Sequence, residues 1–173
     1  MWPIAIALST SAFANDLIPC DNSIRENTMI NSDLASQHAL DHLARSGFEA
    51  LTQLDQDLAT LWLWDAGVIN GGFVDYFASK GGNLAFHAPV ALRRIGAVKT
   101  AEISDTANAI FGSSGPPKEL AERESLLKAF GSKERTLFDS LEAQLFDLEE
   151  DIDELLDQYL NNTAHFSEGA RPT

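Results

Sequence analysis

The most constraining feature of this 173-residue chain is an apolar stripe near its C-terminal end. Its members recur at steps of three and four residues, at Phe138, Leu141, Leu145, Leu148, Ile152, Leu155 and Tyr159. At about 100° of rotation per residue, such positions lie on one face of an α-helix. The stripe therefore predicts a single long helix, capped by Ser132 and running to about residue 160, that buries this face against the rest of the chain.

The opposite face of that predicted helix is acidic. It carries Asp139, Asp147, Glu150, Glu154 and Asp157. No Lys or Arg occurs between Arg135 and Arg171, so the same segment supplies no compensating cation. Like charges near a helix C-terminus also oppose the helix dipole, at a cost on the order of a few tenths of a kcal/mol each. Since stability alone would not select this arrangement, two readings stay open: a solvated outer face, or a face that binds a basic partner.

The charge of the whole chain is strongly negative. The 12 Lys and Arg residues stand against 26 Asp and Glu residues, which gives a formal net charge of −14. Such a surface repels phosphate backbones, so we expect no direct binding to nucleic acids. It attracts basic proteins instead, including proteins that themselves bind nucleic acids. Acidity that serves only to keep the chain soluble is the alternative.

A pair of glycines marks a corner in the first half of the chain. A long helix is predicted to lead into it, from apolar residues at Phe48, Leu51, Leu54, Leu58 and Leu61. Asn70, Gly71 and Gly72 follow, and these residue types tolerate the left-handed backbone that ends a helix. A new helical turn then places three aromatic residues on one face, Phe73, Tyr76 and Phe77.

Two interpretations of this corner stay open. It is a structural turn held by an aromatic plug, or it is a ligand loop with exposed backbone amides. In the second interpretation, the candidate ligand-binding or catalytic residues are Asn70, Asp75, Tyr76 and His87.

Shorter helices complete the predicted fold. They are expected from Asn31 or Ser32 to Arg45, from Pro89 to Gly96, from Thr100 to Phe111 and from Pro117 to Gly131. No stretch shows the alternating pattern of a β-strand. The sequence therefore predicts an all-α fold, a single compact helical domain of six or seven helices over residues 31–160 with a long acidic C-terminal helix, followed by a flexible tail at 161–173.

The first 30 residues are expected to lie outside this domain. Residues 2–8 are apolar, and Ala12 and Ala14 suit the small-residue positions before a signal-peptidase cut. Residues 1–14 are therefore predicted to be a signal peptide and residues 15–30 a connector, which implies a periplasmic or secreted protein; a cytoplasmic protein is the alternative. No apolar run reaches the roughly 20 residues of a membrane-spanning helix. Cys20 is the only cysteine, so an intramolecular disulfide is excluded.

Residues that would support catalysis or metal binding are sparse. His38 and His42 stand four positions apart, a spacing that suits two imidazoles on one metal, but no third ligand is local. The chain has no nucleophile motif and no phosphate-binding loop. We therefore expect no metal, no cofactor and no enzymatic activity.

The corner motif resembles the signature of a known family. Asn70-Gly71-Gly72-Phe73, followed by Tyr76-Phe77 and by Gly81 or Gly82, is similar to the motif of the DMP19-type (DUF4375) proteins. The segments Ala91-Leu92 and Ile95-Gly96-Ala97, the helix that ends in Phe111 and the acidic C-terminal helix add weaker similarities. Asp75 stands where the family usually has Gln, and Gly67 where it often has an acidic residue.

The resemblance implies an all-helical protein that forms a homodimer and acts as a DNA mimic. Such a protein presents carboxylates where a duplex presents phosphates, and so occupies a basic DNA-binding transcription regulator. The first function hypothesis is therefore an acidic interaction protein that sequesters a basic partner, with a structural role for the corner residues. The second is an extracytoplasmic helical ligand-binding protein or small enzyme that uses the Asn70-Gly71-Gly72 corner.

Overall fold

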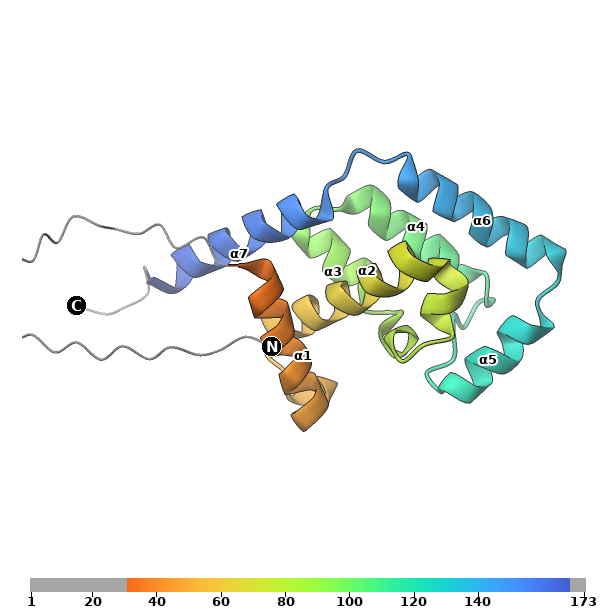
Figure 1. The fold of residues 1–173 in the computed structure, drawn as a ribbon, viewed down its shortest axis with the longest axis horizontal. Coiled ribbons are helices and arrows are strands. Elements are labelled where there is room, and N and C mark those ends of the chain that lie inside the picture. Colours follow the sequence, from red (N-terminus) through yellow and green to blue (C-terminus); the bar gives the residue numbers. More distant parts are fainter. Residues whose placement is uncertain (1–30, 169–173) are drawn as a thin grey trace, which may run out of the picture.

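A computed structural model describes residues 31–168 of the chain (Figure 1). These residues contain no strand, so the all-α prediction is confirmed. They form α1 (Ser32–Ser46), α2 (Gln53–Phe77), α3 (Ala88–Ile95), α4 (Val98–Ala109), α5 (Leu120–Ala129), α6 (Ser132–Phe146) and α7 (Ile152–Glu168), with the 3₁₀ helices η1 (Phe48–Ala50) and η2 (Gly81–Leu84). None of the described helices is long and apolar enough to cross a membrane. The predicted signal peptide (1–14) and connector (15–30) lie outside the described residues.

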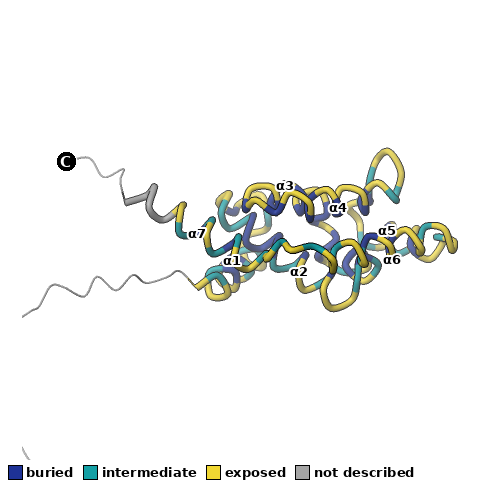
Figure 2. The backbone as a smooth tube through the Cα atoms, turned by 90° about the horizontal axis from the view of Figure 1, so that it is seen from above, coloured by how far each residue is buried: buried dark blue, intermediate teal, exposed yellow. Residues whose placement is uncertain are grey.

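The longest helix, α2, forms the centre of the fold. It contacts α1, α3, α5, α6 and η2, and Figure 1 shows α6 and α7 along one long edge of the molecule with α2, α3 and α4 beneath them. Its buried apolar side chains are Leu58, Ala59, Leu61, Trp64, Val68, Phe73, Tyr76 and Phe77. Burying one large apolar side chain contributes about 1.5–3 kcal/mol, so this row is a main source of stability. Figure 2 shows the buried stretches turned to the inside of the bundle and the exposed stretches to the outside.

Local sequence signals set the ends of the first two helices. The Asn31 side chain caps α1 by accepting a hydrogen bond from the Leu34 N–H at 3.0 Å. Gly47 ends α1 with a positive φ of 79°. Thr52 Oγ1 then caps α2 through the Asp55 N–H at 3.2 Å. These are the residue types that supply such caps, and the predicted first helix is confirmed.

The glycine corner is present as an interruption inside α2. Gly72 has φ 76° and ψ 177°, outside the helical region, and a new helical turn begins at once. Beyond it, the Phe77 ring packs against the rings of Phe111 and Phe138 at centroid distances of 4.8 and 5.8 Å. The prediction of a helix stop, a new turn and an aromatic plug is confirmed.

The prediction of one continuous C-terminal helix from Ser132 to residue 160 is wrong. α6 ends at Phe146 and α7 begins at Ile152. α6 packs on α4 and α2, whereas α7 packs on α3 and α1, so the apolar stripe covers two different parts of the core. Spacing in the sequence does not reveal this, because the three- and four-residue steps continue across the break.

Two carboxylates in the break explain why the helix stops there. Glu150 accepts hydrogen bonds from the backbone N–H groups of Lys99 and Thr100, at 3.0 and 2.9 Å, and so caps the start of α4. Asp151 Oδ1 accepts from the Glu154 N–H at 3.0 Å and caps α7. The N-terminal N–H groups of a helix lack partners within the helix, so these two contacts favour two capped helices over one continuous helix.

Candidate partner-binding surface

The densest acidic surface lies at the break between α6 and α7. Six of the eight residues from Asp147 to Glu154 are acidic, and we call this segment the acidic elbow: Asp147, Glu149, Glu150, Asp151, Asp153 and Glu154. Figure 1 shows it at the outer edge of the fold, where the chain turns from α6 into α7. All but Glu150 are exposed. Within residues 31–163, no acid of the elbow takes part in an ion pair.

The five acids expected on one helix face are divided by the break. Asp139 belongs to α6, Asp147 and Glu150 lie between the two helices, and Glu154 and Asp157 belong to α7. Asp139, Asp147 and Glu154 are exposed, whereas Glu150 and Asp157 are half-buried. The structure therefore replaces a straight row of charges by a bent one that is most concentrated at the elbow.

Glu150 differs from its neighbours because its carboxylate is engaged inside the fold. It also accepts a hydrogen bond from the Thr100 hydroxyl at 2.8 Å. Partial burial alone would raise its pKa, but the hydrogen bonds from Thr100 and Lys99 outweigh it and hold the pKa of Glu150 below its usual value. Its main role in the structure is to join the elbow to the start of α4.

Acids from two other helices extend the surface beyond the elbow. Asp33 of α1, Asp65 of α2 and Asp153 of α7 line one cavity of about 210 Å³. Partial burial and the charge of Asp153 raise the pKa of Asp65. Sequence reasoning missed Asp33 and Asp65, because nothing in their local sequence shows that they lie beside α7.

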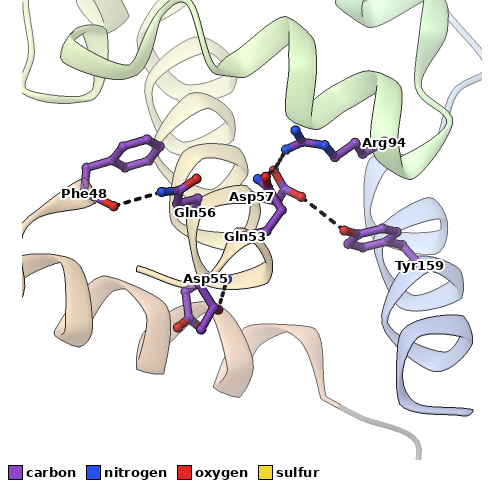
Figure 3. Close-up of polar contacts among 8 residues, drawn as sticks. Phe48, Gln53, Asp55, Gln56, Asp57, Arg94 and Tyr159 are labelled. Carbon is purple, nitrogen blue, oxygen red and sulfur yellow. Dashed lines mark hydrogen bonds and ion pairs between the residues drawn. The ribbon is translucent and has the colours of Figure 1, made fainter. Parts of the chain in front are cut away.

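A buried carboxylate fixes the position of α7 (Figure 3). Asp57 on α2 is 2% exposed. Its Oδ1 lies 2.5 Å from Arg94 Nη1 of α3, and its Oδ2 accepts from the Tyr159 hydroxyl of α7 at 3.1 Å. Gln53 Nε2 donates to the same carboxylate at 3.3 Å. This cluster ties three helices together and thereby holds the acidic elbow in place; sequence reasoning missed it, because Asp57 falls within an apolar-periodic helix.

Two polar groups of the glycine corner are hydrogen-bonded within the fold, whereas the buried Tyr76 hydroxyl has no hydrogen-bond partner among the described residues. The N–H of Phe73 donates to Glu142 Oε1 of α6 at 2.7 Å, and Asn70 Nδ2 donates to the Ala66 carbonyl at 2.9 Å. Tyr76 is buried, and this burial raises the pKa of its hydroxyl. These contacts support the structural interpretation of the motif.

The histidines and the other corner candidates do not converge on one site. The His87 ring packs against the Phe48 ring at a centroid distance of 4.4 Å. Asp75 is exposed, and within residues 31–163 no hydrogen bond joins it to Asn70, Tyr76 or His87. His42 Nδ1 lies 3.2 Å from Asp55 Oδ2 and links α1 to α2, and His38 is exposed. The part of the chain that the structure describes contains no group of three or more metal-ligating side chains.

Comparison with known proteins gives a family match. A family model described as DMP19-like protein matches residues 49–163, which is more than half of the chain. The match includes the glycine corner, the Asp57 cluster and the acidic elbow. No curated protein and no solved structure matches the chain.

Proposed function

This chain belongs to the DMP19-like family, and on that premise we propose that it is an acidic protein-interaction module that acts as a DNA mimic. It binds a basic DNA-binding protein and keeps that protein from its nucleic acid. The observation that carries the proposal is the acidic elbow, in which exposed carboxylates have no ion-pair partner among residues 31–163.

The density of charge at the elbow supports mimicry of a phosphate backbone. Eight residues span at most about 28 Å when fully extended, so six charges there are spaced at about 5 Å or less. One strand of a DNA duplex carries a phosphate every ~3.4 Å of axis, and both strands together carry one every ~1.7 Å. The elbow alone thus approaches one strand, and the second strand requires further acids, such as Asp33 and Asp65 across the neighbouring cavity.

A homodimer would provide a second set of acids. The family resemblance implies such a dimer, and two elbows on one particle would double the number of phosphate-like positions offered to a partner. Size-exclusion chromatography with light scattering measures the mass directly. A mass of twice the 18.8 kDa chain supports the dimer, and a mass equal to one chain at all concentrations contradicts it.

Binding to proteins of the host cell tests the proposal. The elbow variant neutralises Asp147, Glu149, Asp153 and Glu154 as Asn or Gln, and leaves the capping residues Glu150 and Asp151 intact. A matched control neutralises the same number of exposed acids elsewhere, at Asp41, Asp75, Glu102 and Glu122. We expect immobilised wild-type protein and the control to retain a basic DNA-binding protein that elutes as salt rises, and the elbow variant to lose it.

Equal retention by the elbow variant, or no salt-sensitive basic partner at all, would contradict the proposal. The proposal also requires that the protein stays in the cytoplasm, because regulators that bind the genome are located there. Intact-mass measurement on the protein from its own cells tests this point: cleavage after Ala14 would exclude a genomic regulator as the partner.

A further inference from the structure

An apolar cavity of about 580 Å³ lies on the side of the molecule formed by α1, η1 and η2. Its apolar walls come from four elements and comprise Leu40, Leu43, Phe48, Leu63 and Leu84. A cavity of this size and lining suits a small molecule with an apolar body. None of the acids of the elbow lines it.

The rim of this cavity gathers positive charge in a strongly negative protein. Lys80 and Lys118 both line it, and within residues 31–163 neither makes an ion pair. Partial burial lowers the pKa of His87, a third lining residue, so its ring is neutral near pH 7 and the lysines supply the charge. Glu49 is the one carboxylate among the lining residues. These two lysines beside apolar walls complement an anion that carries an apolar tail.

A buried arginine holds this rim in a fixed shape. Arg123 is 0% exposed. Its guanidinium donates to the carbonyl of Ser79, the residue before Lys80, at 2.9 Å and to the carbonyl of Lys118 at 2.6 Å. It also donates to Asn83 Oδ1 at 2.7 Å. Since Arg123 occupies the amide oxygen, the Asn83 amide nitrogen, on a residue that lines the cavity, is left as a donor.

Glycine at position 82 permits this arrangement. A Cβ on Gly82 would lie 2.9 Å from Arg123 Nε and 3.0 Å from the Phe77 Cα. Cβ atoms do not approach other heavy atoms to less than 3.0 Å, so a larger residue would displace Arg123 from the loop. The second glycine loop of the motif is therefore coupled to the shape of the cavity rim.

We propose that this cavity binds an amphipathic anion, a carboxylate on a medium-length aliphatic or aryl tail. The tail lies against the leucines and Phe48, and the carboxylate accepts hydrogen bonds from Lys80, Lys118 and the Asn83 amide. The site is separate from the acidic elbow, so this proposal does not depend on DNA mimicry.

Isothermal titration with dodecanoate below its micelle concentration tests the proposal. We expect saturable binding at one site per chain, and no such binding of dodecyltrimethylammonium, which has the same tail and the opposite charge. The double variant Lys80→Gln/Lys118→Gln should weaken binding by about tenfold or more. A matched control, Lys128→Gln/Lys133→Gln, removes the same charge from α5 and α6 and should leave binding unchanged.

Two further variants separate the tail from the head group. Leu43→Trp fills the cavity and should abolish binding, whereas Glu49→Gln removes the lining carboxylate and should tighten binding several-fold. Circular dichroism and thermal unfolding verify that each variant is folded. Absence of saturable dodecanoate binding, equal binding of the cationic detergent, or equal loss in the control and the lysine variants would overturn the proposal.

Discussion

Glu142 of α6 accepts a hydrogen bond from the backbone N–H of Phe73, a residue 69 positions earlier that begins the helical turn after the Gly72 kink. The first N–H groups of a helical turn have no partner in the turn itself, so this carboxylate completes the corner. The contact joins the family motif to the acidic C-terminal half of the chain. It explains why a glycine pair in the middle of a long helix is compatible with a stable fold.

Gly72→Ala should destabilise the protein by about 2 kcal/mol or more. The φ and ψ of Gly72 fall in a region almost restricted to glycine, where other residues lose about 1–3 kcal/mol. A Cβ there would also collide with the Glu142 carboxylate. Urea unfolding monitored by circular dichroism measures the change.

Gly112→Ala serves as the control for that experiment. Gly112 also has a positive φ of 98°, but a Cβ there would meet nothing within 4 Å. Gly112→Ala should therefore lower the free energy of unfolding by less than Gly72→Ala does, because it introduces backbone strain without a collision. Equal losses at the two positions would contradict a role for the Glu142 contact.

Removing the Asp57 carboxylate should loosen α7. Asp57→Ala leaves Arg94 and the Tyr159 hydroxyl without their shared partner. Breaking a buried ion pair costs about 3–5 kcal/mol, and because the Arg94 side chain is 38% exposed we expect a smaller loss of stability, about 2–3 kcal/mol. Hydrogen exchange should rise in α7 before it rises in α2. A uniform rise in all helices would contradict a local role for the cluster.

The features of the fold that the sequence predicts depend on residues close together in the chain, and those that it does not predict depend on residues far apart. Asn31, Gly47 and Gly72 act on their own neighbours, so the sequence could predict the first helix and the corner. The second helix is predicted to begin at Phe48, but residues 48–50 form η1 and α2 begins at Gln53 after its Thr52 cap. The apolar spacing continues across this boundary and conceals it. The break after Phe146 depends on Glu150 reaching the start of α4, 50 residues earlier, and no local pattern contains that information.

For the candidate site, the sequence predicted the charge of the C-terminal segment but not the positions of its acidic residues in space. Acidic composition predicted that the C-terminal segment would be charged, and the structure places six of those charges in one bend. The apolar stripe concealed the bend, because its spacing is the same in one helix and in two. Asp33 and Asp65 join the surface only through packing of α1 and α2 against α7, which composition cannot predict.

Glu150 should make part of the stability dependent on pH in the acidic range. Its pKa is lowered in the folded state, so its contribution is present above the unfolded pKa and is lost as pH falls through the folded one. Glu150→Gln should reduce the free energy of unfolding at pH 7 and flatten its decline below about pH 4.5. A variant whose stability falls with acid as steeply as the wild type would contradict the capping role.

Asp65 should change the stability with pH in the opposite direction to Glu150. Its pKa is raised by partial burial and by the charge of Asp153, so the folded state favours the protonated form and stability is lost as pH rises. Asp65→Asn should therefore stabilise the protein at pH 7, with a difference that disappears near pH 3. The same substitution at Asp41, an exposed acid on α1, is the control and should change stability little at either pH.

The central claim is that the acidic elbow and a DNA duplex compete for the same surface of a basic protein. The most direct measurement is fluorescence anisotropy of a labelled duplex bound to the purified partner, titrated with this protein. We predict that the wild type releases the duplex completely, and that the elbow variant requires at least about tenfold more protein, a difference of ~1.4 kcal/mol. A stable complex of all three components, or equal release by the wild type and the elbow variant, would contradict the account.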